Sequence, residues 1–262
     1  MTSYEPDSAV GLPLLRQAWR TVTFLHWRYP PPVVQPALPP GLTADEHDGS
    51  AWVTMVLLEM RDVRLAATPA VPGLSTFPET NLRTYVRGPG GRQGLWFFSL
   101  DAASTWITVG ARLMLGLPYF LARLAIDTGD GLRYTGTRRG RRPAGYRVHA
   151  RPGPAMPRAE REIWLTHRWR AYTEHAGLLL EVPVRHEPWP LRAATTTVLD
   201  QSLTAAAGLP PPDGEPLVHY SEGVTKVAFG AARPVRTPAA HALAAWGGRA
   251  PAAQSVAARR GR

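Results

Sequence analysis

One short stretch of the chain, FPETNLRTYVRG from Phe77 to Gly88, combines side chains of four chemical kinds. In a strand, alternate residues share a face, so Glu79, Asn81, Arg83 and Tyr85 point the same way. Inside a closed sheet, this carboxylate, amide, guanidinium and phenol would orient a small polar ligand, because buried charges are either paired or used. On an outer face, the same row would be a solvated strand with a surface ion pair. The residues alone leave both interpretations open.

A second candidate lies in the segment ARLMLGLPYFLA, residues 111–122. We expect one helix over about Ala103 to Met114 and a second that begins near Pro118, because proline suits the first helical turn. Tyr119 would then stand at a helix N-terminus, where free N–H groups attract anions. It would either point into a pocket or pack as an ordinary aromatic residue. Arg112, on the first helix, is our candidate ion-pair partner for Glu79.

Several kinds of chemistry are excluded by what the sequence lacks. The chain has no cysteine, which excludes disulfides, thiolate metal sites and a cysteine nucleophile. It has no HExxH, P-loop, GxGxxG or GxSxG motif, so we predict no cofactor and no serine hydrolase. His26, His167 and His219 are too scattered to predict a metal site. The sequence HEPWP, residues 186–190, is typical of a rigid turn.

The elements that must position these residues are mostly strands. β-branched and aromatic runs bounded by turn residues predict them at regular spacing, which is typical of a barrel or a sandwich. A Gly-rich connection predicts that Glu79 to Val86 and Leu95 to Leu100 are antiparallel neighbours. A third helix is expected from Ala194 to Ala207. The predicted class is α+β, mostly β. The other predicted strands are 20–27, 50–58, 132–136, 146–150, 164–169, 178–184 and 218–227.

Composition and charge limit the size of the core and the kinds of partner that the chain can have. With 44% hydrophobic residues among 262, the chain can bury a sizeable core. The formal net charge of +10 invites a nucleic-acid interpretation, and the segment Arg133 to Arg151 holds seven arginines and no acid. Such a segment gives salt-dependent affinity for any polyanion, so a nucleic-acid partner is the alternative and not our main expectation. The chain has a single lysine, Lys226.

The chain divides into a loose leader (residues 1–15), one domain (16–233) and a disordered Arg/Ala/Pro-rich tail (234–262). The N-terminus has no signal-peptide pattern. The apolar stretch from Ala102 to Ile126 is interrupted by Arg112, Pro118 and Arg123, which argues against a membrane span. We therefore expect a cytoplasmic protein without a membrane partner. The sequence leaves a homo-oligomer open.

Several segments together resemble the YqjF-like bacterial family, a domain of unknown function, from about Trp19 to Val227. That family is distantly similar to acetoacetate decarboxylase, which implies a cone-shaped β-barrel with a few helices. The motifs that carry the resemblance are HW (26–27), DGSAWV (48–53), FPETNLRTYV (77–86), FFSLDA (97–102), ARLMLGLPY (111–119), LTHRW..Y (165–172), HEPWPL (186–191) and HYSEGV (219–224).

The decarboxylase resemblance also shows a difference at the position of the catalytic lysine. In that enzyme a lysine that follows the sequence Gly-Phe-Pro forms a Schiff base with the β-keto acid. The two matching positions here are Tyr119 and Phe120, and neither side chain can form an imine. Glu79 falls near the enzyme's pocket acid, and Arg20 corresponds to an arginine on its first strand. The resemblance thus implies a similar pocket without the nucleophile.

The sequence predicts a site for a small polar ligand that carries a carboxylate or a carbonyl group. The predicted ligand-binding residues are Arg20, Glu79, Asn81, Arg83, Arg112 and Tyr119. Such a set could perform acid–base chemistry such as enolisation or dehydration, or it could only bind. A polyanion-binding protein that uses Arg133 to Arg151 is the alternative. A protein with only a protein-interaction role is the third possibility.

Overall fold

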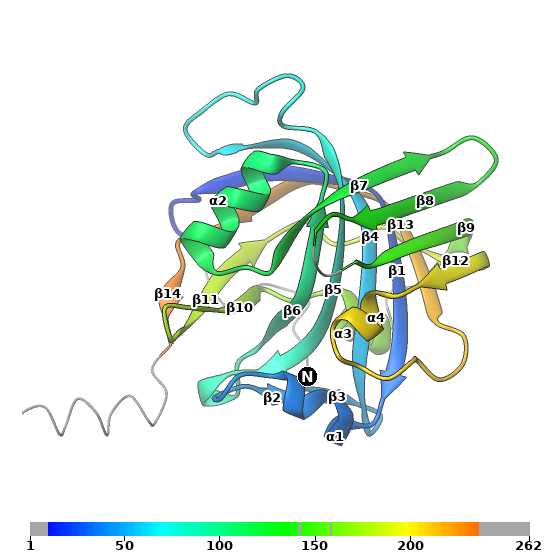
Figure 1. The fold of residues 1–262 in the computed structure, drawn as a ribbon, viewed down its shortest axis with the longest axis horizontal. Helices are drawn as coiled ribbons and strands as arrows, with labels where there is room; N and C mark the ends of the chain where they lie inside the picture. Colours follow the sequence, from blue (N-terminus) through cyan, green and yellow to red (C-terminus); the bar gives the residue numbers. More distant parts are fainter. Residues whose placement is uncertain (1–9, 141–142, 158, 236–262) are drawn as a thin grey trace, which may run out of the picture.

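The computed structural model describes residues 10–140, 143–157 and 159–235, and its dominant feature is one 14-stranded sheet (Figure 1). The strands are β1 (Leu15–Tyr29), β2 (Thr43–Ala44), β3 (Glu46–His47), β4 (Ser50–Leu65), β5 (Phe77–Arg87), β6 (Gln93–Ala102), β7 (Tyr119–Asp127), β8 (Leu132–Arg138), β9 (Gly145–Ala155), β10 (Arg170–His175), β11 (Leu178–Arg185), β12 (Leu191–Gln201), β13 (Leu217–Phe229) and β14 (Arg233–Pro234). The helices are α1 (Pro31–Val34), α2 (Thr105–Leu115), α3 (Glu160–Thr166) and α4 (Leu203–Ala206), with 3-10 turns at Gln35–Ala37 and Pro89–Gly91. The predicted class, α+β and mostly β, is confirmed.

The sheet closes on itself twice around a shared wall of five strands, β13, β1, β4, β5 and β6. Strands β7, β8, β9 and β12 close one ring, because β7 pairs with β6 and β12 pairs with β13. Strands β10 and β11 close a second ring, because β10 pairs with β6 and β11 pairs with β13. We call these the nine-strand ring and the seven-strand ring, counting the wall in both. Figure 1 shows the two groups of closing strands on opposite sides of the wall.

The wall is apolar on both faces because each face lines one of the rings. Along β1, Leu25 and Trp27 pack in the core of the nine-strand ring, whereas Val22 and Phe24 pack in the core of the seven-strand ring. This division follows from the period-2 alternation of strand side chains. A strand buried on both faces has a near-continuous hydrophobic sequence, as in SAWVTMVLL at the start of β4.

The β5–β6 pair confirms the predicted hairpin. The two strands are antiparallel, with Glu79 opposite Ala102 and Tyr85 opposite Leu95. Their connection contains Gly90 and Gly91, both with φ of 74°, a left-handed conformation that glycine adopts without steric cost. The prediction succeeded here because the pairing is local and the turn residues are explicit.

The predicted helix at Pro118 is wrong, because Tyr119 begins strand β7. Helix α2 ends as expected, at Gly116 in the left-handed conformation (φ 65°). The chain then returns to the sheet, and β7 lies parallel to the end of β6, with Tyr119 opposite Leu100. Proline at the first position suits a strand as well as a helix, and the pairing with β6 decides between them.

Two further expectations are corrected. The predicted strand 164–169 begins within helix α3, whose first turn carries Glu160 and Glu162, acids that suit a helix N-terminus. The predicted helix 194–207 is mostly strand β12, followed by the short α4. The β-branched run TTTV within β12 favours a strand, and its pairing with β9 outweighs the neighbouring alanines.

The expected leader and tail fall mostly outside the described residues. Strand β14 contains Pro234 and pairs with β11, and Val235 packs against a small apolar cluster around Tyr172. The first residue of the predicted tail thus belongs to the sheet, and the second, Val235, donates a backbone hydrogen bond to the Leu179 carbonyl. Within the described part of the chain, no helix combines the length and the apolar character needed to cross a membrane.

Candidate functional site

The polar face of β5 points into the seven-strand ring. Glu79, Asn81 and Tyr85 are buried, with relative exposures of 3%, 6% and 0%, and Arg83 is half-buried. Arg83 lies over the Phe24 ring, 5.8 Å from its centroid, on the inner side of the wall. The opposite face of β5 belongs to the nine-strand ring, where Leu82 packs in the core. The row of polar groups is therefore internal, and the surface-strand interpretation is wrong.

Glu79 and Tyr119 form the first part of the site. The Tyr119 hydroxyl donates a hydrogen bond of 2.9 Å to Glu79 Oε2. Burial raises the pKa of Glu79 to about 7, and the nearby Asp101 carboxylate also raises it, although hydrogen bonds from Tyr119 and Asn81 act in the opposite direction. A carboxyl group that titrates near neutral pH can both give and take a proton, which is what general acid–base chemistry requires.

Arg83 and Asn81 form the second part, and both have polar atoms without partners. Within the described residues, Asn81 Oδ1 and Arg83 Nε are buried atoms that form no hydrogen bond. No carboxylate of the described chain forms an ion pair with Arg83. Burial lowers the pKa of Arg83, and the neighbouring Tyr85 phenol only partly offsets this effect. A half-buried guanidinium with a buried, unpartnered N–H donor and no carboxylate partner is suited to bind a carboxylate or phosphate.

The structure does not bring Arg20 and Arg112 to this face. Arg20 follows Trp19, which packs in the seven-strand ring, and it is the cross-strand neighbour of Glu59 on β4. By strand alternation Arg20 therefore lies on the opposite face from Trp19. Arg112 is exposed on helix α2. Tyr119, and not Arg112, is the partner of Glu79, because the α2–β7 turn carries Tyr119 back to the sheet.

Sequence reasoning missed a layer of stacked rings beside Arg83. Trp19 and Trp189 stack with centroids 5.6 Å apart, and His186 lies 5.1 Å from Trp189 and 4.9 Å from Trp169. Trp189 also meets Phe24 edge-on at 5.2 Å. Burial lowers the pKa of His186 to about 4, so this imidazole is neutral at physiological pH. The HEPWP segment supplies two of these rings, so the predicted turn also lines the interior.

A groove of about 860 Å³ opens over this aromatic layer, with Trp169 and His186 in its lining. Four cationic side chains also line it, and none forms an ion pair within the described residues: Arg16, Arg64, Arg185 and Lys226. Two carboxylates share the lining with these four cations: Asp62, and Glu187, which accepts hydrogen bonds from the backbone N–H groups of Thr225 and Lys226. The groove therefore has a cationic rim.

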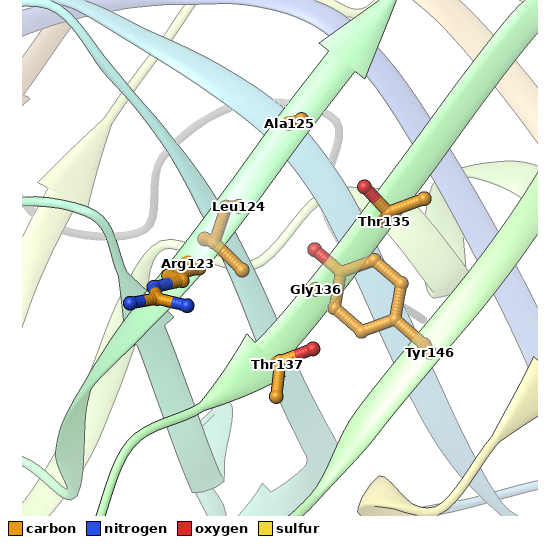
Figure 2. A pocket seen from close by; sticks show the side chains of 7 residues that line it. All are labelled: Arg123, Leu124, Ala125, Thr135, Gly136, Thr137 and Tyr146. Atoms are coloured by element: carbon orange, nitrogen blue, oxygen red, sulfur yellow. The ribbon is translucent and has the colours of Figure 1, made fainter.

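A smaller cavity of about 220 Å³ lies elsewhere, between β7, β8 and the start of β9 (Figure 2). The Tyr146 ring crosses over Gly136, where any Cβ would collide with it. The Tyr146 hydroxyl reaches Thr80 on β5 at 2.6 Å. Apart from Tyr146, the only ionisable side chain in this lining is Arg123, which is exposed. The cavity is separate from the polar face of β5.

Three of the five described arginines in the Arg133 to Arg151 segment form ion pairs. Arg138 is buried and forms a two-pronged pair with Asp101, at 2.9 and 3.2 Å. Arg133 pairs with Asp127 at 3.4 Å, and Arg147 lies 3.9 Å from Asp200. Arg141 and Arg142 are outside the described residues. Only the Arg138 pair is buried, and Arg139 and Arg151 form no ion pair within the described residues.

Comparison with solved structures shows which fold this is. The chain matches an acetoacetate decarboxylase-like enzyme from Sphingomonas wittichii RW1 (TM-score 0.59, 17% identity, 90% of this chain and 99% of that one). It matches acetoacetate decarboxylase from Legionella pneumophila equally well (TM-score 0.59, 14% identity, 90% and 92%). The enduracididine biosynthesis enzyme MppR, in complex with pyruvate, follows (TM-score 0.57, 16% identity, 87% and 93%). At these identities the likeness establishes the acetoacetate decarboxylase-like fold.

Comparison with sequences is more specific. The uncharacterized protein YqjF of Bacillus subtilis (strain 168) is 35% identical over 216 residues, which cover 81% of this chain and 89% of that protein. The family model of DUF2071, described as an uncharacterized conserved protein, matches residues 16–225. The chain belongs to the DUF2071 family.

Proposed function

We propose that the chain binds a small keto acid on the polar face of β5. Arg83 would hold the carboxylate, and Asn81 and the Glu79–Tyr119 pair would face the carbonyl end. The observation that carries the proposal is the Arg83 guanidinium, whose buried Nε forms no hydrogen bond and which no carboxylate of the described chain neutralises. Leaving a charge buried and unpaired is costly, and an anionic ligand would remove that cost.

The spacing of the polar groups supports a short ligand. Residues two apart on a strand are separated by roughly 7 Å along it, so Glu79, Asn81 and Arg83 form a row roughly 13 Å long. A carboxylate at one end and a carbonyl a few bonds away fit such a row. The cationic rim of the groove would also favour the approach of an anion. The neighbour MppR has been observed with pyruvate, which agrees with this ligand class at the level of the fold.

The chemistry available is acid–base and not imine formation. Glu79, with its pKa near 7, could move a proton to or from the carbon next to a carbonyl group while Tyr119 stays hydrogen-bonded to it. No lysine lies on this face, because the only one, Lys226, is exposed on β13. An enolisation or a dehydration fits the set better than a Schiff-base decarboxylation does.

Two measurements test the proposal. Native mass spectrometry of freshly purified protein should show a stoichiometric bound acid of low mass. Calorimetric titration with acetoacetate and with pyruvate should show binding that Arg83→Gln weakens by about 10- to 150-fold, since a charge-assisted hydrogen bond contributes about 1.5–3 kcal/mol. Arg112→Gln is the matched control, because it removes the same charge from an exposed position. Equal affinity in the two variants would refute the proposal.

A further inference from the structure

Five buried side chains form a series that begins at Tyr85, the last residue of the polar β5 face, and that we call the His26 network: Tyr85, Thr54, His26, His219 and Glu162. The Tyr85 and Thr54 oxygens are 2.8 Å apart, and Thr54 Oγ1 is 2.8 Å from His26 Nδ1. His26 Nε2 is 3.2 Å from His219 Nδ1, and His219 Nε2 is 3.8 Å from Glu162 Oε1. The wall supplies four members, through β5, β4, β1 and β13, and α3 supplies Glu162.

The hydrogen bonds of this network run in one direction. The Tyr85 hydroxyl donates to the Leu165 carbonyl at 2.6 Å, which uses its only proton. Thr54 must then donate to Tyr85, and His26 Nδ1–H must donate to Thr54. His26 Nε2 consequently accepts from His219 Nδ1–H. His219 Nε2 is left as an acceptor, and it is a buried atom that forms no hydrogen bond.

A second arrangement of the same protons reverses every bond. Tyr85 donates to Thr54, Thr54 to His26 Nδ1, His26 Nε2–H to His219, and His219 Nε2–H to Glu162. Each residue carries the same number of protons as before, but both histidines have changed tautomer. The second arrangement gives His219 Nε2 a partner and deprives the Leu165 carbonyl of its donor. The state of Tyr85 is therefore coupled to the state of His219.

The charges around the network keep both imidazoles neutral. Burial lowers the pKa of His26 well below its ordinary value, and His219, Arg83 and Arg161 lower it further. Burial lowers the pKa of His219 to about 4, opposed by Glu162. Arg168 lies over the Tyr85 ring, with its guanidinium carbon 4.9 Å from the centroid, and also faces the network. A neutral imidazole has one proton and one free lone pair, which is what passing a proton along requires.

The two ends of the network lie in different surroundings. At one end, Tyr85 is two residues from Arg83 on the same face of β5, so this phenol stands beside the proposed carboxylate site. At the other end, Arg161 donates to Glu162 Oε1 at 2.8 and 3.0 Å, and its own side chain is 41% exposed. The network therefore runs from the proposed ligand site to a carboxylate whose ion-pair partner, Arg161, reaches the protein surface.

We propose that the His26 network is a proton relay between the Arg83 site and Glu162. Its ligand end rests on the proposed function. In one passage, Glu162 gives a proton taken from solvent to His219 Nε2, and His219 gives its Nδ1 proton to His26 Nε2. His26 passes its Nδ1 proton to Thr54, Thr54 passes its own to Tyr85, and Tyr85 gives one to the ligand. One proton enters at Glu162 and one leaves at Tyr85. A proton that Tyr85 later takes back from the ligand, passed along the same groups in the reverse direction to Glu162, restores the first arrangement.

The test uses nitrogen-15 NMR of the histidine rings in the ligand-free protein at pH 7, where the protonated nitrogen is identified directly. In the wild type, His26 and His219 should both be neutral and protonated on Nδ1. In Tyr85→Phe, the Thr54 proton is free to turn to His26, so both rings should switch to Nε2–H. His149 on β9, outside the network, is the internal control and should not change.

A double variant shows whether the coupling passes through Thr54. In a Thr54→Val background, adding Tyr85→Phe should change His219 less than it does with Thr54 present, because only the 3.5 Å contact between the Tyr85 hydroxyl and His26 Nδ1 remains. A His219 ring that ignores Tyr85→Phe, or that responds equally without Thr54, would overturn the relay. The wild type alone also tests the relay, so the test does not depend on whether the variants fold. Charged rings, or rings protonated on Nε2, would overturn the relay. The test needs no ligand, so a failure of acetoacetate binding would count against the proposed function alone.

Discussion

Substituting Glu79 by glutamine should make the protein more stable at alkaline pH, which is an unusual outcome for a buried site residue. Glutamine has nearly the same shape as the protonated acid and can still accept the Tyr119 hydrogen bond. It cannot ionise. The variant therefore removes only the cost of burying a carboxylate inside the seven-strand ring, where the relative exposure of Glu79 is 3%.

The magnitude follows from the pKa of Glu79, which is 4.5 as the reference value and about 7 in the folded protein. Below pH 4.5 both the folded and unfolded states hold the proton, and the cost is absent. Between pH 4.5 and 7 only the folded state holds it, so unfolding releases a proton and stability falls as pH rises. Above pH 7 the full cost applies. The two values differ about 300-fold in the dissociation constant, which corresponds to about 3 kcal/mol.

Urea unfolding at a series of pH values measures this directly. The stability of Glu79→Gln minus that of the wild type should rise by about 3 kcal/mol between pH 4.5 and pH 8. Subtracting the two proteins largely removes the contributions of other titrating groups. Glu174→Gln is the control, because Glu174 is exposed on β10, and its difference from the wild type should stay flat. A flat difference for Glu79→Gln would refute the buried, protonatable acid.

Three further expectations concern other parts of the molecule. Acetoacetate or pyruvate with borohydride should leave no stable adduct, because the exposed Lys226 is the only lysine; a stoichiometric adduct in the mass spectrum would contradict this. Asp101→Asn should destabilise the fold by about 3–5 kcal/mol in urea unfolding, because it leaves the Arg138 guanidinium buried without its partner, and Arg138→Met in the same background should restore part of the loss. Gly136→Ala should cost about 1–3 kcal/mol through its collision with the Tyr146 ring, and a smaller cost in a Tyr146→Ala background would identify that contact as the cause.

The elements predicted correctly from sequence are those whose evidence is local. The alternation in residues 79–85 and the Gly-rich turn after Arg87 define the β5–β6 hairpin without reference to the rest of the chain. Tyr119 shows where local evidence fails. A proline and an aromatic residue after a helix are compatible with a second helix, and the parallel pairing with β6 that makes β7 a strand cannot be read from that segment.

The site residues that were predicted correctly are also those whose evidence is local. Glu79, Asn81 and Arg83 were predicted because one strand carries all three, whereas Arg112 was assigned as a partner without knowledge of the direction of helix α2. His26 and His219 looked unrelated because 193 residues separate them in sequence. The antiparallel register of β1 and β13, with Phe24 opposite His219, brings them together. No feature of either segment indicates that register.

The pairing of β1 with β13 also determines when the two rings can close during translation. Both rings need this pair to close, yet β1 ends at Tyr29 and β13 ends at Phe229, 200 residues later. At translation rates of about 5–20 residues per second, the ribosome needs roughly 10 to 40 seconds to cover that distance. Throughout this interval β1 lacks its β13 neighbour, so one edge of the wall stays open even though β4, β5 and β6 can already pair. A nascent chain in that condition is a substrate for chaperones that shield exposed strands, and its dependence on them should end when β13 leaves the ribosome.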